Sequence, residues 1–389
     1  MPVPRAPGTD AGTRSAAAPS RFPDPSRTTH DHHRRTPPAT TSGRRPHPAA
    51  RRPRGGRPLT RRAGRHLRRL RTAAHDLGFF YAVGHGIPRE VEDDLLAATR
   101  TFFALPEDER RRISNTRSPQ FRGYTSLATE QTAGAPDERE QIDIGVERPA
   151  LDLGPEDPAY LRLVGPNQWP ERVPELKPAV LRWQAEAGRV ARTVLALLAE
   201  ALGEEPTWFD RWFDDEAVST TKLVRYPAPP VGLAPGDAGQ GVGAHKDYGW
   251  LALVLQDEHQ GLEVRGDDGG WIEATPVPGT LVVNVGEALE VATGGYLRAN
   301  VHRVVVPRDG DDRYSIPYFL APRYDAVVEP LTLPADLAAQ ARGVEQDPDN
   351  PIYAEYGRKA LVGWLRSHPE VARRHHADLL EDPQWNPAR

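Results

Sequence analysis

The chain has 389 residues, 38% of them hydrophobic, and it contains no cysteine. This length and composition predict a globular body with a large core and exclude disulfides, thiolate metal sites and cysteine nucleophiles. The net charge of −4 is uneven: twelve arginines and three acidic residues give the first 60 positions +9, which leaves −13 on the remainder. An acidic body argues against a main domain that binds nucleic acid.

The first segment, residues 1–58, is rich in Pro, Arg, Gly, Ser and Thr and has no helical or strand periodicity. Such a composition predicts a disordered basic tail without function. A nucleic-acid arm, a transit peptide or a wrongly chosen start codon are the alternatives. No apolar run reaches the roughly 18 to 20 residues that span a bilayer, and no signal peptide is indicated, so we expect a cytoplasmic protein without a membrane partner.

Residues 59–217 are expected to form a helical N-terminal region. Apolar residues at helical spacing predict a helix that Gly78 ends, and the apolar run 79–83 then predicts a strand. A second helix is expected to begin at Pro88, and a long one to cover 175–202.

Residues 218–325 have a different pattern, in which short β-rich runs alternate with Gly, Pro and Asp. Strands at this spacing predict a sandwich or barrel. The expected strands cover 220–226, 250–256, 261–265, 271–275, 280–285, 302–307 and 313–320. Helical patterns return beyond residue 331, so residues 326–389 are expected to form C-terminal helices, the clearest of them from Tyr353 to Leu365.

Candidate metal ligands occur within the β-rich region. His245 and Asp247 are two residues apart, so on a strand they would point to the same face and could reach one ion. His302 begins another expected strand. Two imidazoles and one carboxylate form the facial triad of non-haem Fe(II) oxygenases, which leaves three adjacent positions on the iron open for O2 and a co-substrate.

A candidate carboxylate site follows the last of these residues. Arg313 and Ser315 are again two apart on an expected strand, and a guanidinium beside a hydroxyl can bind a carboxylate. The interval from His302 to Arg313 is long enough for a strand, a turn and a returning strand, which would place the carboxylate site beside the metal.

Together these motifs resemble the isopenicillin N synthase-like branch of the 2-oxoglutarate/Fe(II) dioxygenases, over roughly residues 66–370. The resemblance implies an α+β protein whose core is a double-stranded β-helix, or jelly roll, flanked by N-terminal and C-terminal helices. Further matching segments are 78–87, 167–170, 256–257, 261–264, 284–286 and 302–304.

The resemblance also implies the roles of individual residues. His245, Asp247 and His302 would hold Fe(II), and 2-oxoglutarate would chelate the iron while its far carboxylate pairs with Arg313 and Ser315. Tyr226 resembles the family residue that helps to bind this carboxylate. Asn284 lies near the iron or caps a turn, and residues 122–125 face the substrate or serve packing. The presence of Asp247 does not favour a halogenase.

The leading hypothesis is therefore an oxidoreductase that uses Fe(II), 2-oxoglutarate and O2 to hydroxylate, desaturate or cyclise a small molecule, with release of succinate and CO2. One rival is an oxidase of the isopenicillin N synthase type, which uses Fe(II) and O2 without 2-oxoglutarate. An ethylene-forming enzyme is a second rival. A non-catalytic binding protein is a third, although such a protein would not need a metal with open positions.

Overall fold

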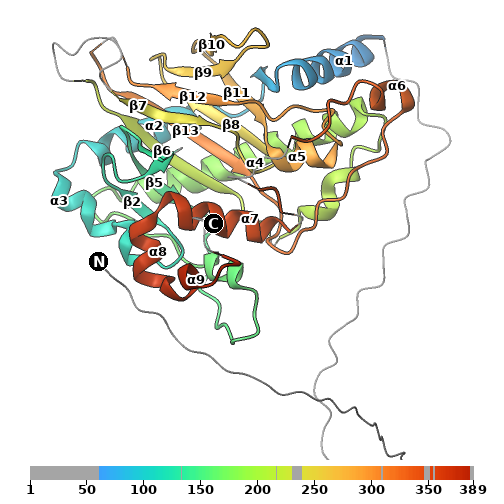
Figure 1. The fold of residues 1–389 in the computed structure, drawn as a ribbon. Coiled ribbons are helices and arrows are strands. Elements are labelled where there is room, and N and C mark those ends of the chain that lie inside the picture. Colours follow the sequence, from blue (N-terminus) through green and yellow to red (C-terminus); the bar gives the residue numbers. More distant parts are fainter. Residues whose placement is uncertain are drawn as a thin grey trace, which may run out of the picture. The chain divides into compact units, whose positions relative to one another are not determined.

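The structure is a computed structural model that describes residues 61–132, 134–215, 217–229, 239–307, 310–345, 351–353 and 355–385. The tail expected over residues 1–58 lies outside these ranges. Two large antiparallel sheets, a two-stranded hairpin and a set of helices make up the described part of the chain (Figure 1).

The larger sheet has seven strands in the order β1-β11-β8-β13-β6-β5-β2. Its strands, in that order, are Phe79–Val83, Thr280–Val285, Leu251–Gln256, Arg313–Leu320, Thr220–Tyr226, Glu140–Ile144 and Gly123–Thr125. The smaller sheet has the order β10-β9-β12-β7, with strands Trp271–Glu273, Leu262–Arg265, His302–Val305 and Gln240–His245. A short hairpin pairs β3 (Gln131–Thr132) with β4 (Ala135–Pro136).

The helices lie mainly before and after the β-rich region. They are α1 (Arg61–Asp76), α2 (Arg89–Phe103), α3 (Glu107–Arg110), α4 (Leu176–Ala201), α5 (Glu287–Ala292), α6 (Ala335–Ala338), α7 (Tyr356–Ser367), α8 (Pro369–His375) and α9 (Ala377–Glu381). The long helix α4 contacts β8 and β13 of the larger sheet as well as α1 and α2 (Figure 1). One face of the larger sheet is thus covered by helices.

Side chains on the two faces of the larger sheet belong to two separate hydrophobic cores. On β8, Leu251, Leu253 and Leu255 face the helices and join the larger core. Val254, which points the other way, packs against a smaller core that contains Val282 and also residues of the smaller sheet. This second core therefore fills the space between the two sheets, as in a jelly roll.

Several strands have the bounds that the sequence predicts. The strands over 79–83, 220–226, 280–285 and 313–320 are confirmed as β1, β6, β11 and β13. The expectation that His245 and Asp247 share a strand is wrong. His245 is the last residue of β7, and Asp247 lies in the following loop. The strands that begin at His302 and Arg313 also belong to different sheets.

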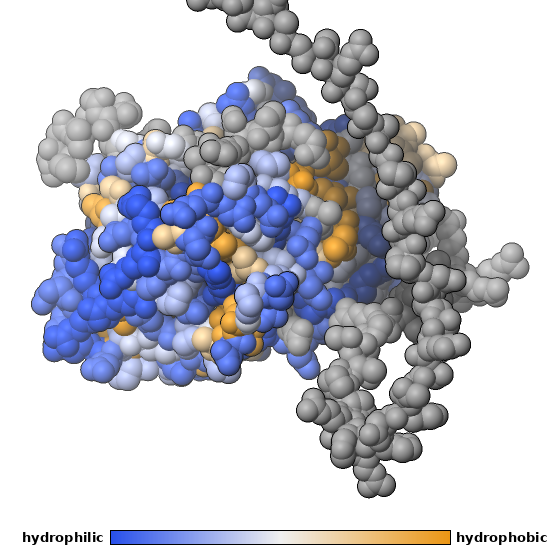
Figure 2. All heavy atoms as spheres, turned by 60° about the horizontal axis from the view of Figure 1, so that its bottom comes forward, coloured by the Kyte–Doolittle hydropathy of each residue, from blue (hydrophilic) through white to orange (hydrophobic). Residues whose placement is uncertain are grey.

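The larger sheet contains strands from both expected regions, because β1, β2 and β5 precede residue 217 and the others follow it. The boundaries at 59, 218 and 326 stay a prediction. Among the described residues, no helix is long and apolar enough to cross a membrane. The face in Figure 2 is largely hydrophilic, with apolar side chains gathered in small patches.

Candidate metal centre

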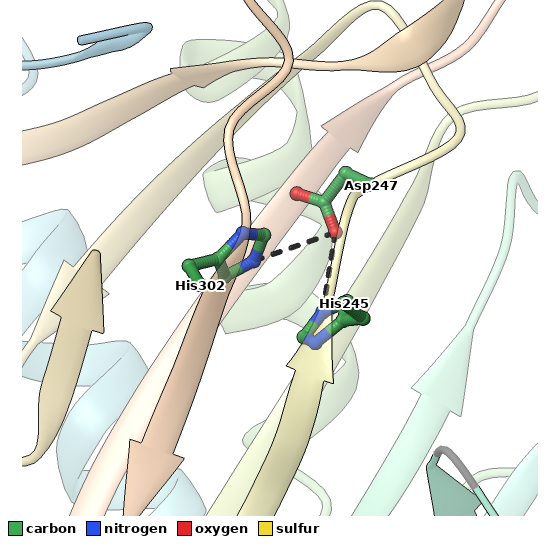
Figure 3. A group of neighbouring side chains, drawn as sticks. All are labelled: His245, Asp247 and His302. Atoms are coloured by element: carbon green, nitrogen blue, oxygen red, sulfur yellow. Dashed lines mark ion pairs between the residues drawn. The ribbon is translucent and has the colours of Figure 1, made fainter. Parts of the chain in front are cut away.

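Three potential ligands meet where the smaller sheet ends. His245 ends β7, His302 begins β12, and the two are register partners in the antiparallel pair. Asp247 Oδ1 lies 3.6 Å from His245 Nε2 and 3.7 Å from His302 Nε2 (Figure 3). All three candidate donor atoms lie within 4.8 Å of one another. The structure therefore brings together the three residues that the sequence suggests as ligands.

Backbone carbonyls orient both imidazoles. His245 Nδ1 lies 2.8 Å from the Gly243 carbonyl, and His302 Nδ1 lies 3.2 Å from the Asn300 carbonyl. A carbonyl can only accept, so each Nδ1 carries the proton and donates it. When the ring is neutral, its Nε2 therefore keeps a lone pair on the side of Asp247, which is the arrangement that a metal-binding histidine requires.

The carboxylate of Asp247 is fixed from the larger sheet. Asn284 on β11 donates its Nδ2 hydrogen to Asp247 Oδ2 at 2.7 Å, which leaves Oδ1 facing the imidazoles. Burial by itself raises the pKa of Asp247, but His302, His245 and Asn284 outweigh it and hold the pKa below its ordinary value. Asn284, for which the sequence left two interpretations open, thus contacts the candidate metal site.

The surroundings of His302 favour its neutral form. Burial, followed by the neighbouring His245, lowers its pKa to about 4, although Asp247 acts in the opposite direction. A metal ligand must be the unprotonated imidazole. Phe79 of β1 packs edge-on against this ring, with centroids 5.2 Å apart.

A buried cation lies on the neighbouring part of the larger sheet. Arg313 begins β13, is 1% exposed, and pairs in register with Tyr226. Its Nη2 donates to Gln256 Oε1 at 2.9 Å and its Nε to the His259 carbonyl at 3.3 Å. Its Nη1 has no hydrogen-bond partner among the described residues, so it can still donate to a bound anion.

The structure places the other two residues predicted for this carboxylate site, Tyr226 and Ser315, near Arg313. The Tyr226 ring lies 5.0 Å from the Arg313 guanidinium carbon, and Ser315 is buried on the same face of β13 as Arg313. Sequence reasoning missed the contacts of Gln256 and of the His259 carbonyl. Gln256 faces Ser315 across the β8–β13 pair, a register that could not be known before the strands were paired.

A second group of possible ligands, Asp257, Glu258 and His259, has a structural role instead. Asp257 Oδ2 accepts the Tyr314 backbone N–H at 2.7 Å and lies 3.1 Å from His259 Nδ1. Arg100 lies 3.4 Å from Glu258. These contacts hold the turn whose His259 carbonyl orients Arg313.

The donor set of the first group suits iron. Two neutral imidazoles and one carboxylate from one side of an ion form the facial triad, and they leave neighbouring positions open. Among the described residues, Nη1 of Arg313 has no hydrogen-bond partner. It can therefore bind an anion beside the adjacent strands of the larger sheet. The arrangement can therefore hold an Fe(II) ion together with a ligand that carries a carboxylate at its far end.

This chain is similar to known proteins over most of its length. Residues 58–172 match the family described as non-haem dioxygenase in morphine synthesis N-terminal, and residues 221–322 match the 2OG-Fe(II) oxygenase superfamily. A 2-oxoglutarate-dependent dioxygenase, frbJ, from Dothideomycetidae sp. (strain 11243) is 36% identical over 79% of this chain and 86% of its own length. A homoarginine-6-hydroxylase of Arabidopsis thaliana is 33% identical over 75% of this chain and 86% of its own length.

Solved structures show the same fold. A protein assigned to the 2OG-Fe(II) oxygenase family from Caulobacter crescentus superimposes with a TM-score of 0.62 at 27% identity, over 77% of this chain and 93% of the other. The dioxygenase for auxin oxidation in rice gives a TM-score of 0.55 at 25% identity, over 80% of this chain and 94% of the other.

Proposed function

The chain belongs to the 2-oxoglutarate/Fe(II) oxygenase superfamily and oxidises a small molecule with Fe(II), 2-oxoglutarate and O2, and we propose that His245, Asp247 and His302 hold the iron. The observation that carries this assignment is the convergence of three donors with the tautomers that metal binding needs. Iron with 2-oxoglutarate bound supplies the activation of O2, with release of succinate and CO2.

Arg313 is proposed to bind the far carboxylate of 2-oxoglutarate, with help from Ser315 and Tyr226. In support, its Nη1 is buried and without a hydrogen-bond partner among the described residues, while Gln256 and the His259 carbonyl orient the rest of the guanidinium. A buried cation without a charge of opposite sign costs stability. The carboxylate of the co-substrate would provide that charge.

The chain's own side chains would orient the reactants. The Asn284 amide would keep Asp247 Oδ1 directed toward the ion, because it occupies Oδ2. The Gly243 and Asn300 carbonyls would hold the imidazole protons at Nδ1, away from the ion. The substrate would approach where Pro317 and Phe319 lie half-buried on the inner face of the larger sheet.

The test is an anaerobic Fe(II) titration followed by 2-oxoglutarate, monitored by visible absorption. A weak charge-transfer band near ~500 nm is expected, since a 2-keto acid then chelates an iron with open adjacent positions. His245→Ala should abolish iron binding but leave the fold intact by circular dichroism. Iron binding of undiminished affinity in this variant would refute the ligand assignment.

A further inference from the structure

Four tyrosine rings form a continuous line that starts beside the candidate metal centre. Tyr248 directly follows Asp247, and its ring lies 6.0 Å from that of Tyr356, the first residue of α7. Tyr356 stacks on Tyr324 with centroids 6.5 Å apart, and the ring of Tyr324 lies 6.2 Å from that of Tyr160. These separations are typical of aromatic rings in contact, between which an electron can pass.

The far end of this tyrosine line has a proton acceptor. The Tyr160 hydroxyl donates to Glu355 Oε1 at 2.9 Å. Glu355 directly precedes α7 and is partly exposed, whereas Tyr160 is buried. Of the four rings, the described hydrogen bonds give a carboxylate acceptor to Tyr160 alone. A tyrosine that loses an electron also loses its phenolic proton, so oxidation is most favourable at Tyr160.

Helix α7 holds the line together through two glycines. A Cβ on Gly357 would lie 2.5 Å from Cγ of Tyr160 and 2.7 Å from the Tyr324 carbonyl oxygen. A Cβ on Gly363, later in the same helix, would lie 3.6 Å from the ring of Tyr248. Glycine inside a helix costs stability relative to alanine. Gly357 therefore has a packing reason, because it lets the ring of Tyr160 lie against α7.

A second aromatic line begins nearby but is less suited to lose an electron. The rings of Trp250 and Trp212 are 5.0 Å apart, and those of Trp212 and Trp208 are 5.3 Å apart. The guanidinium carbon of Arg211 lies 4.1 Å from the ring centroid of Trp208 and 4.9 Å from that of Trp212. Its positive charge opposes the removal of an electron from either ring. The carboxylate of Glu355 favours the tyrosine line instead.

Electron balance shows when such a line would be needed. Reduction of O2 to water takes four electrons, and 2-oxoglutarate supplies two of them when it becomes succinate and CO2. The primary substrate supplies the other two. If no substrate is bound, these two electrons must come from the metal and the protein. Cysteine and methionine are readily oxidised, but the chain has no cysteine and its only methionine is Met1.

We propose that Tyr248, Tyr356, Tyr324 and Tyr160 form an electron relay that reduces the metal centre after it has reacted with O2 without substrate. Tyr160 gives one electron to the metal centre through the other three rings. Its O–H bond breaks, the proton passes to the Glu355 carboxylate, and a neutral tyrosyl radical remains. Fe(II) supplies the second electron and becomes Fe(III), and the oxygen atom leaves as water with two protons from solvent. The proposal rests on the proposed function, because iron and 2-oxoglutarate generate the oxidant.

Electron paramagnetic resonance tests this relay. The full chain, loaded anaerobically with Fe(II) and 2-oxoglutarate, is mixed with O2 in the absence of substrate and frozen at successive times. We expect the signal of a tyrosyl radical, whose hyperfine pattern should narrow when the protein contains ring-deuterated tyrosine. Tyr160→Phe should lose this signal because phenylalanine has no phenolic proton. Glu355→Gln should lose it because an amide cannot accept the proton. Protein without iron should give no signal.

Other variants separate the relay from packing. Tyr356→Phe keeps Tyr160 and Glu355 but interrupts the line, so it should also lose the signal. The matched control is Tyr124→Phe: Tyr124 on β2 likewise donates to a carboxylate, that of Glu140, at 2.5 Å, but it lies outside the line. This variant should keep the wild-type signal. Trp212→Phe, in the tryptophan line, should keep it too.

The outcomes distinguish the relay from the proposed function. Every variant should retain the charge-transfer band near ~500 nm, which shows that its metal site is intact. If the wild-type protein has this band but forms no radical, or if Tyr160→Phe or Tyr356→Phe keeps the wild-type spectrum, the relay is overturned. A tryptophanyl radical that Trp212→Phe removes would overturn it as well. Absence of the band in the wild-type protein would instead refute the proposed function.

Discussion

In the candidate metal centre, the ring nitrogen that carries the proton of each histidine depends on a backbone carbonyl that would not bind the metal. The carbonyl two residues before each histidine fixes its tautomer, so this part of the design is local in sequence. The contact that fixes Asp247 is not local, since Asn284 comes from another strand. Such partners tune metal affinity although they do not touch the metal.

Asn284→Ala should therefore weaken iron binding. Asp247 Oδ2 would lose its donor, and the carboxylate could turn away from the imidazoles. We expect the Kd for Fe(II) to rise about 10- to 100-fold in an anaerobic titration. Asn115→Ala is the control, because Asn115 is also buried and bonded, to Thr125, but is no neighbour of the triad. Unchanged affinity in Asn284→Ala would contradict the proposed geometry.

Arg313→Lys should weaken the binding of 2-oxoglutarate. A lysine keeps the charge but loses the planar fork that Gln256 and the His259 carbonyl orient. The Kd from titration of the charge-transfer band should rise at least about tenfold, since hydrogen bonds to charged groups contribute about 1.5–3 kcal/mol. The Fe(II) affinity of the same variant serves as the control and should not change. Equal Kd values for 2-oxoglutarate would argue against this role.

At the scale of elements, the turn from β11 into α5 shows how close backbone approach builds the site. Gly286 lies between the two elements, and a Cβ there would be 2.2 Å from the Gly249 carbonyl oxygen and 3.1 Å from the Asp247 carbonyl oxygen. The next residue, Glu287, donates its backbone N–H to the Asp247 carbonyl at 2.8 Å. The loop that carries Asp247 is thus held against the start of α5.

Gly286→Ala should consequently destabilise the fold and disturb the metal centre. The backbone must shift, and overpacking of this kind costs about 1–3 kcal/mol. Denaturant unfolding would measure the loss, and an Fe(II) titration would show weaker binding. Gly64→Ala is the contrasting control: this glycine is inside α1 with its nearest neighbour at 3.5 Å, so alanine should raise stability slightly. A Gly286→Ala protein as stable as wild type would speak against these close contacts.

A buried ionic cluster joins β5 and β6 to the segment that precedes α8. Its members are Glu130, Arg139, Asp143, Lys222 and His368. Lys222 Nζ lies 3.0 Å from Glu130 and 3.3 Å from Asp143. Burial alone raises the pKa of both carboxyl groups, but the surrounding cations outweigh it and lower both below their ordinary values.

Lys222→Met should therefore be strongly destabilising, by about 3–5 kcal/mol, because it leaves two buried carboxylates short of a cation.

In the wild-type protein, carboxyl groups of lowered pKa stabilise the fold above their unfolded pKa values, near 4.5 and 3.8, and this contribution is lost as the pH falls further. The variant should unfold at a higher pH during acid titration. Lys177→Met, at a half-exposed pair with Glu147, should change stability by less than about 1 kcal/mol.

Apolar runs decide which elements can be predicted from the sequence. Strands β1, β11 and β13 carry such runs, so their bounds are predictable. Strand β7 (Gln240–His245) escapes prediction because glycine and alanine fill half of it, and β5 because only Ile142 and Ile144 of its five residues are apolar. The candidate ligands are predictable from residue type and spacing.

At the scale of the whole molecule, the candidate metal centre connects the two sheets. His245 and His302 belong to the smaller sheet, whereas Asp247 is bonded to Asn284 on the larger one. A metal bound by all three would link the sheets across the jelly-roll interior. The metal should then increase the free energy of unfolding of the whole fold, in addition to ordering the site itself.

Fe(II) and 2-oxoglutarate together should therefore raise Tm under anaerobic conditions. Each ligand at about 100 times its Kd adds roughly 2.7 kcal/mol to the free energy of unfolding, if it binds only the folded state. A chelator should reverse the shift. The Asp247→Ala variant, which loses the ligand between the sheets, should show no iron-dependent rise, and a rise equal to wild type would exclude this link.

The order of the strands also has a consequence for synthesis. β1 closes one end of the larger sheet by pairing Phe79 with Asn284, about two hundred residues later in the chain. At roughly 5–20 residues per second, a ribosome needs about 10–40 s to supply that partner. For this time the apolar run that starts with Phe79 and Phe80 has no strand beside it, so the yield of folded enzyme in the cell should depend on chaperones that bind the nascent chain.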